Sequence, residues 1–240
     1  MAERAAIVTG GSSGIGLAIA RMLVEEGHAI TLAARRPEKL ESAAAELSSE
    51  GAEVQHVAGN MADEETVRRV VQAHQERFKR LDVLVNNAGV GIGAPVGEIQ
   101  TKHLDLQLDV NLRSIILFYR ECADLLRAAG AEHRNALVIN MSSISGKRGE
   151  AWLSVYSASK HGVVGFTEAM NKELGGEGIK SCALCPAFVD TPMTEFAKEN
   201  VPGEEMIRPQ DIAEAARALL RVSPACVIPE IMFQRPGAAL

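Results

Sequence analysis

The stretch Arg4-Ala-Ala-Ile-Val-Thr-Gly-Gly-Ser-Ser-Gly-Ile-Gly16 begins as an apolar strand and continues through a glycine-rich turn into a helix. Within it, Gly10 permits a tight turn, Gly14 lets a ligand approach the main chain, and Gly16 allows close helix packing. The free N–H groups at a helix N-terminus attract phosphate. This context predicts a dinucleotide site rather than a P-loop, because no Gly-Lys-Ser/Thr follows. The residues expected to bind the cofactor here are Thr9, Gly10, Ser12, Ser13, Gly14, Ile15 and Gly16.

Apolar and helical patterns alternate regularly along the rest of the chain. Strands are expected over Arg4–Val8, Ala29–Ala33, Glu53–Val57, Leu81–Val85, Ala136–Met141, Ile179–Cys185 and Val227–Phe233. Helices are expected over Gly14–Glu26, Pro37–Ser49, Glu64–Phe78, Thr101–Ala129 (with a break near Asn111), Ser154–Leu174, Thr191–Lys198 and Gln210–Arg221. This order predicts an α/β fold, a doubly wound parallel sheet of the Rossmann type with about seven strands and helices on both faces.

Length and composition limit the possible classes of protein. The 240 residues would suit one or two domains, and the absence of a linker or repeat favours a single domain over residues 1–240. A net charge of −6 and an aromatic content of 4% argue against a nucleic-acid-binding protein. No apolar run is long enough to span a membrane, and the N-terminus lacks a signal-peptide pattern. We therefore expect a cytoplasmic protein.

The end of the second expected strand bears on cofactor choice. An NAD-selective site would place an acid there to bind the ribose hydroxyls. This chain instead has Ala34 followed by Arg35 and Arg36. Guanidinium groups match phosphate in charge and geometry. The sequence therefore predicts NADP(H) as cofactor, with Arg35 the stronger candidate for the 2′-phosphate, although the pair could also be a solvated helix start.

Tyr156 and Lys160 form a candidate acid–base pair on one helix face, because residues i and i+4 are neighbours there. A free tyrosine has a pKa of about 10, and a nearby ammonium lowers it toward neutrality. Three hydroxyls at the end of the fifth expected strand, those of Ser142, Ser143 and Ser145, are further candidates. Local sequence does not choose among them, but a hydrolase is disfavoured because no GxSxG motif surrounds them.

Taken together, these motifs resemble the short-chain dehydrogenase/reductase family over nearly the whole chain. The matching elements are TGxxxGIG at Thr9–Gly16, NNAG at Asn86–Gly89, a serine 13 positions before the tyrosine, and YxxxK at Tyr156–Lys160. The resemblance implies that Tyr156 exchanges a proton with the substrate oxygen, that Ser143 binds this oxygen, and that Lys160 binds the nicotinamide ribose. It also implies that Asn111 is the fourth catalytic residue and holds a water that links Lys160 to solvent.

The resemblance implies further cofactor contacts. These are Asn60 and Met61 near the adenine, Asn87, Ala88 and Gly89 after the fourth strand, and Pro186, Val189 and Thr191 near the nicotinamide. The chain departs from the family pattern at Ala187, where glycine is usual, and at its C-terminus, which lacks the frequent Asp-Gly-Gly. Because alanine resists a positive φ, the turn at Ala187 could differ from that of the family.

The predicted function is NADPH-dependent reduction of a ketone or aldehyde to an alcohol, or the reverse reaction. The substrate is expected to be largely apolar, because the expected wall consists of Ala94, Trp152, Leu153, Met193 and Phe196. A catalytically silent NADP-binding sensor is the alternative. By analogy with the family, helices Asn111–Ala129 and Ser154–Leu174 are expected to form a homodimer or homotetramer interface.

Cys182 and Cys185 have the spacing of a CxxC motif, but they lie on an expected strand. Residues i and i+3 of a strand face opposite sides of the sheet, and no second cysteine or histidine pair stands nearby. Both are therefore expected to be core residues, and no metal site is predicted.

Overall fold

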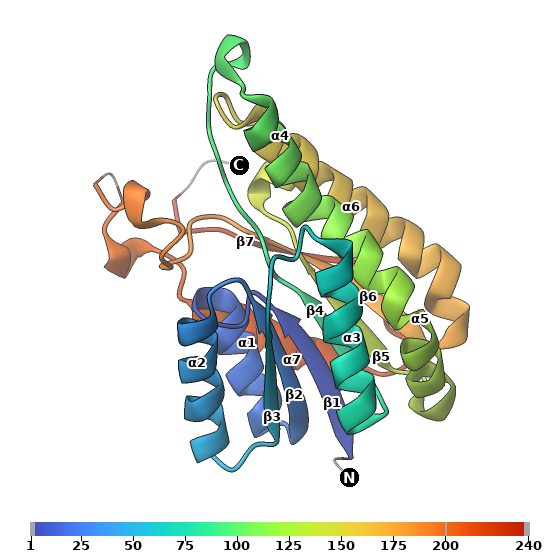
Figure 1. The fold of residues 1–240 in the computed structure, drawn as a ribbon. Coiled ribbons are helices and arrows are strands. Elements are labelled where there is room, and N and C mark those ends of the chain that lie inside the picture. Colours follow the sequence, from blue (N-terminus) through green and yellow to red (C-terminus); the bar gives the residue numbers. More distant parts are fainter. Residues whose placement is uncertain (1–2, 200, 238–240) are drawn as a thin grey trace.

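The computed structural model describes residues 3–199 and 201–237 and has one parallel sheet (Figure 1). Its strands are β1 (Arg4–Thr9), β2 (His28–Ala34), β3 (Val54–Ala58), β4 (Val83–Asn86), β5 (Ala136–Met141), β6 (Ile179–Pro186) and β7 (Glu230–Phe233). Their order in space is β3-β2-β1-β4-β5-β6-β7. The order reverses between β1 and β4, the kind of point at which ligands bind in open parallel sheets. The predicted seven-stranded Rossmann architecture is confirmed.

The α-helices lie where the periodicity places them, with small differences at their ends. They are α1 (Gly14–Glu25), α2 (Pro37–Ser49), α3 (Glu64–Phe78), α4 (Thr101–Leu108), α5 (Ser114–His133), α6 (Ser154–Leu174) and α7 (Pro209–Arg221). The break expected near Asn111 is a π-helical turn over Asp109–Arg113, between α4 and α5. The helix expected over Thr191–Lys198 is wrong: only a 3-10 turn over Glu195–Ala197 forms there.

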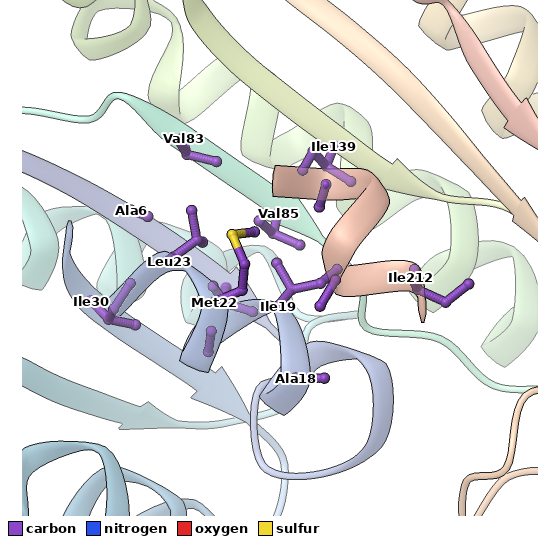
Figure 2. Close-up of a cluster of buried hydrophobic side chains, with 14 of the residues drawn as sticks. Ala6, Ala18, Ile19, Met22, Leu23, Ile30, Val83, Val85, Ile139 and Ile212 are labelled. Atoms are coloured by element: carbon purple, nitrogen blue, oxygen red, sulfur yellow. The ribbon is translucent and has the colours of Figure 1, made fainter. Parts of the chain in front are cut away.

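Two layers of helices enclose the sheet, and strands β1, β2, β4, β5 and β6 are buried along nearly their whole length (Figure 1). On one face α1, α2 and α7 pack against the sheet, and Figure 2 shows Ile19, Met22 and Leu23 of α1 among Val85, Ile139 and other strand side chains. On the opposite face α3, α5 and α6 cover the strands, with Phe118 of α5 fully buried.

The β1–α1 turn has the geometry that its glycines predict. Gly10 has φ +65° and Gly14 has φ +56°, a region that residues with a side chain rarely adopt. A Cβ on Gly16 would lie 2.4 Å from the carbonyl oxygen of Gly10 and 2.4 Å from Nδ2 of Asn87. Glycine at position 16 therefore lets α1 begin directly beside the turns that follow β1 and β4.

Cys182 and Cys185 are buried free cysteines in β6, and they belong to different clusters of the core. The prediction that they are core residues is confirmed. Within the described residues, no helix combines the length and the apolar character that a membrane span requires.

Candidate active site

A cleft of about 720 Å³ runs along the carboxyl edge of the sheet, in the size range of small-molecule sites. It passes from the β1–α1 turn, over the ends of β4 and β5, to the segment after β6. Of the predicted residues, those that line it are Gly10, Ser12, Ser13, Gly14, Ile15, Arg35, Arg36, Asn60, Met61, Asn87, Ala88, Gly89, Ser143, Tyr156, Lys160, Pro186, Val189, Thr191 and Met193. Residues from the ends of six strands and from helix α6 thus meet in one cavity.

Tyr156 and Lys160 lie on the first turns of α6 and face the cleft, as their i, i+4 spacing predicts. The Nζ atom of Lys160 lies 5.7 Å from the centroid of the Tyr156 ring. The lysine is almost completely buried, and its Nζ donates a hydrogen bond of 2.7 Å to the main-chain oxygen of Met141 at the end of β5. Burial lowers the pKa of Lys160 to about 8, because a charged ammonium loses hydration inside the protein.

The pKa of Tyr156 differs from the sequence-based expectation. Burial is the largest effect and raises it above the ordinary value, while the nearby Ser143 hydroxyl acts in the opposite direction. The expected lowering of the Tyr156 pKa by Lys160 is therefore wrong in direction, because burial outweighs it. A phenol with a raised pKa stays protonated at neutral pH, which is the state that a proton donor requires.

Ser143 is the second residue after β5 and lines the cleft. Its Oγ accepts a hydrogen bond from the main-chain N–H of Ser145 (3.1 Å) and donates one to the oxygen of Pro186 (3.4 Å). These contacts orient the hydroxyl between β5 and β6, beside Tyr156. Ser142 also lines the cleft, whereas Ser145 does not, so the tertiary structure reduces the three serine candidates to two.

Asn111 is fully buried in the π-helical turn and lies behind the cleft. Its Nδ2 donates to the hydroxyl of Ser159 (3.1 Å), which in turn donates to the main-chain oxygen of Tyr156 (2.7 Å). The side chain therefore hydrogen-bonds directly to α6 and connects to Tyr156 through Ser159. The predicted water between this region and Lys160 stays a prediction.

Two predicted cofactor residues act as supports of the cleft rather than as its lining. The hydroxyl of Thr9 accepts hydrogen bonds from the main-chain N–H groups of Asn87 (2.9 Å) and Ala88 (3.0 Å). Gly16 lies beneath the β1–α1 turn. Both residues stabilise the turns after β1 and β4 without lining the cavity. A sequence motif does not separate such supporting residues from those that line the cleft.

Part of the predicted substrate wall is not in the cleft. Trp152 and Ala94 line a small separate pocket, and the indole of Trp152 packs on Gly93. Phe196 is 67% exposed, and neither it nor Leu153 lines either cavity. Trp152 has φ +69°, a backbone conformation that local sequence did not indicate. Only Met193 of the predicted apolar wall lines the cleft.

Ala187 adopts no positive φ, and its N–H donates a 3.0 Å hydrogen bond to the oxygen of Phe233 in β7. Alanine is therefore compatible with this turn. Several cleft residues were not predicted from the sequence, because they belong to no motif and reach the cavity only through packing. They are Gly59, Val90, Gly91, Ile92, Leu106, Val110, Met141, Pro192 and Thr194.

Comparison with known proteins agrees with this geometry. The family described as short chain dehydrogenase matches residues 4–202. The chain belongs to the short chain dehydrogenase family. Its seven-stranded sheet and its cleft are those of an oxidoreductase of this family.

The chain is also similar to individual relatives and solved structures. A "Granaticin polyketide synthase putative ketoacyl reductase 1" from Streptomyces violaceoruber is 42% identical over 206 residues, covering 84% of this chain and 74% of the relative. A variant of actinorhodin polyketide ketoreductase with NADPH has 32% identity and a TM-score of 0.87, covering 97% of each chain. An alcohol dehydrogenase from Thermococcus sibiricus with 5-hydroxy-NADP has 30% identity and a TM-score of 0.87, covering 98% of this chain and 99% of that one.

Proposed function

We propose that this short chain dehydrogenase reduces the ketone of a largely apolar ketoacyl compound, or a related ketone or aldehyde, to an alcohol with NADPH. The carrying observation is that Ser143, Tyr156 and Lys160 meet at one end of a cleft whose other end has the glycine turn and two arginines. The similarity to ketoacyl reductases supports the acyl ketone as substrate class. We also propose that residues 1–240 act as one unit, since all these groups line one cavity.

The residues of the cleft fit a nicotinamide dinucleotide. The left-handed Gly10 and Gly14 bring main-chain N–H groups to the start of α1, where a pyrophosphate binds favourably. Arg35 and Arg36 lie on the cleft at the end of β2, in position to bind a 2′-phosphate. Thr191 lies against this turn, because a Cβ on Gly14 would come within 3.1 Å of its methyl group. When bound, the cofactor supplies or accepts a hydride.

The protein supplies orientation and a proton. Tyr156, held neutral by burial, donates its phenolic proton to the carbonyl oxygen during reduction and is left as the phenolate. In the reverse reaction this phenolate takes the proton from the alcohol. Ser143 binds the same oxygen and limits its movement. Lys160 faces Tyr156 with a positive charge, which favours the phenolate that forms when the proton leaves. Ile92, Leu106, Val110 and Met193 give this end of the cleft an apolar lining.

The test is NADPH consumption by the purified protein with an acetoacetyl thioester of N-acetylcysteamine, a cyclic ketone and an aromatic aldehyde. Replacement of Tyr156→Phe is expected to abolish turnover and to leave NADPH binding nearly intact. Tyr119→Phe is the matched control, because Tyr119 is the other tyrosine of the chain and is buried between Ser181 and Asn140, away from the cleft. Turnover retained by Tyr156→Phe would contradict the mechanism, and NADPH binding with no turnover would favour the silent sensor.

The homodimer or homotetramer stays a prediction. Ala158 and Gly165 lie exposed on α6, and the exposed side chain of Ile116 lies on α5, so these helices have an open face. Gly162 instead packs inside the chain, where a Cβ would lie 2.8 Å from Leu112. A monomer in light scattering at micromolar concentration would refute the prediction. The cytoplasmic location also stays a prediction.

A further inference from the structure

The side-chain ammonium and the main-chain oxygen of Lys160 each hydrogen-bond to one of two consecutive residues at the end of β5. Its Nζ donates a 2.7 Å hydrogen bond to the main-chain oxygen of Met141. Its own main-chain oxygen accepts a 3.0 Å hydrogen bond from the hydroxyl of Ser142. In this dipeptide Met141 and Ser142 therefore hold the ammonium and the backbone of Lys160, respectively. Together the two contacts set both the position and the direction of the lysine side chain.

The dipeptide is itself rigid. The main-chain N–H of Ser142 donates a 2.8 Å hydrogen bond to the oxygen of Leu184 in β6, and Ser142 is almost completely buried. A carbonyl oxygen has two lone pairs, so the oxygen of Lys160 accepts the serine hydroxyl without leaving the helix. The hydroxyl thus joins α6 to the sheet at the level of Lys160.

Gly146 shows how closely the chain packs around this contact. A Cβ at this position would lie 2.4 Å from the Oγ of Ser142 and 2.7 Å from the main-chain oxygen of Lys160. Gly146 has no positive φ, so the position requires glycine for space rather than for backbone conformation. The turn over Ile144–Gly146 closes over the hydrogen bond and excludes a side chain from it.

The contacts with Met141 and Ser142 matter for Lys160 because few titratable side chains lie near its ammonium. The titratable side chains that face it are Tyr156 on the same helix and Cys185, a buried thiol of β6. A buried lysine side chain has many rotamers and is costly to charge, so its position must be set by a few strong contacts.

We propose that Ser142 is a positioning residue of the active site, whose hydroxyl holds the backbone of Lys160 so that the ammonium meets the cofactor ribose and Tyr156. This inference rests on the proposed function of Lys160. Ser142 acts through Lys160 and does not itself touch the reacting atoms. The competing explanation is a strand-end hydroxyl that stabilises the fold and has no effect on the site.

The experiment compares Ser142→Ala with Ser145→Ala, a buried serine of the same turn that does not line the cleft. The dissociation constants of NADPH and NADH are measured by fluorescence titration, and kcat and KM are measured with a ketone that the wild type reduces. For Ser142→Ala we expect NADPH binding about fivefold weaker and kcat about tenfold lower, with KM for the ketone within about twofold. For Ser145→Ala we expect all these constants within about twofold of the wild type.

Thermal unfolding of each variant separates positioning from stability. If Ser142→Ala lowers only the melting temperature and leaves kcat and cofactor binding at wild-type values, the proposal is wrong. An equal loss of kcat in Ser145→Ala would also overturn it, because the effect would then belong to the turn as a whole. If Ser142→Ala does not fold, Ser142→Cys, which keeps a weaker donor, is measured against the same criteria.

The binding measurement distinguishes this proposal from the proposed function. A wild type that binds NADPH but reduces none of the carbonyl compounds would overturn the proposed reaction, while the binding constants of the two variants still decide on Ser142. A wild type that binds neither nucleotide would overturn both.

Discussion

The side-chain amide of Asn111 hydrogen-bonds to both polar main-chain groups of Val90. Its Oδ1 accepts from the N–H of Val90 at 2.8 Å, and its Nδ2 donates to the oxygen of Val90 at 2.9 Å. The side-chain amide of Asn111 thus hydrogen-bonds to a residue 21 positions away through the same two main-chain groups that a neighbouring strand would use. The segment after β4, whose Gly91 lies against the ring of Tyr156, is therefore fixed to the π-helical turn.

We expect Asn111→Ala to lower the free energy of unfolding by about 2–4 kcal/mol, because three hydrogen bonds from one fully buried side chain, two to Val90 and one to Ser159, are lost. Urea denaturation measures this change. Asn135→Ala is the control, since its side-chain amide donates one 3.4 Å hydrogen bond, to the oxygen of Leu220, and we expect a loss below about 1 kcal/mol. Equal losses in the two variants would contradict the structural role of Asn111.

Replacement of Lys160→Met is expected to abolish turnover and yet to stabilise the cofactor-free protein. Burial lowers the pKa of Lys160 from 10.5 to about 8, so charging this group at neutral pH costs the folded state up to about 3 kcal/mol. Between about pH 8 and pH 10.5 the unfolded chain binds more protons, and the wild type gains stability as pH rises.

The advantage of Lys160→Met is therefore largest below about pH 8 and shrinks toward pH 10.5. Urea denaturation at several pH values measures it. Lys39→Met on the exposed surface of α2 is the control and should show no such dependence. A Lys160→Met variant that is less stable than the wild type at neutral pH would show that the lysine contributes net stability.

Asp82 is expected to stabilise the end of the sheet opposite the cleft. Its buried carboxylate accepts hydrogen bonds from the N–H of Ala5 (2.8 Å), from two nitrogens of Arg80 (2.9 and 2.7 Å) and from Nε2 of His133 at 3.0 Å. Burial alone would raise its pKa, but these partners, Arg80 foremost, hold the pKa below 3.8. Replacement of Asp82→Asn should lower the free energy of unfolding by about 3–5 kcal/mol at neutral pH.

The sign of its pH dependence follows from the lowered pKa. The stabilisation by Asp82 is present above the unfolded pKa of 3.8 and is lost as pH falls through the folded pKa. The wild type should therefore lose stability in acid more steeply than Asp82→Asn. Acid titrations followed by circular dichroism measure both slopes, and parallel curves would refute this assignment.

Arg35→Ala is expected to reduce the preference for NADPH over NADH. Arg35 is exposed at the end of β2 and lines the cleft beside Ala34, where an acid would favour NADH. Losing one charge-assisted contact to the 2′-phosphate should lower the NADPH/NADH ratio of kcat/KM about tenfold or more. The control is Lys39→Ala on the exposed surface of α2, outside the cleft lining, which should leave this NADPH/NADH ratio unchanged. If Arg35→Ala also leaves the ratio unchanged, the assignment of Arg35 to the 2′-phosphate is wrong.

The amino-acid sequence by itself determined the order of strands and helices, the glycine turn and the Tyr156–Lys160 pair. These features depend on contacts between residues at most a few positions apart, where backbone preference and periodicity act directly. Even the π-helical interruption could be placed near Asn111, although its hydrogen bonds to Val90 could not.

Only the tertiary structure decided which side chains of separate turns meet. Trp152 lines a small separate pocket rather than the cleft, and Gly146 packs against the contact between Ser142 and Lys160. The direction of the Tyr156 pKa shift was decided in the same way, since burial depends on every element packed around the group. These outcomes depend on how loops that are distant in the chain pack together, and no local pattern of residues encodes that packing.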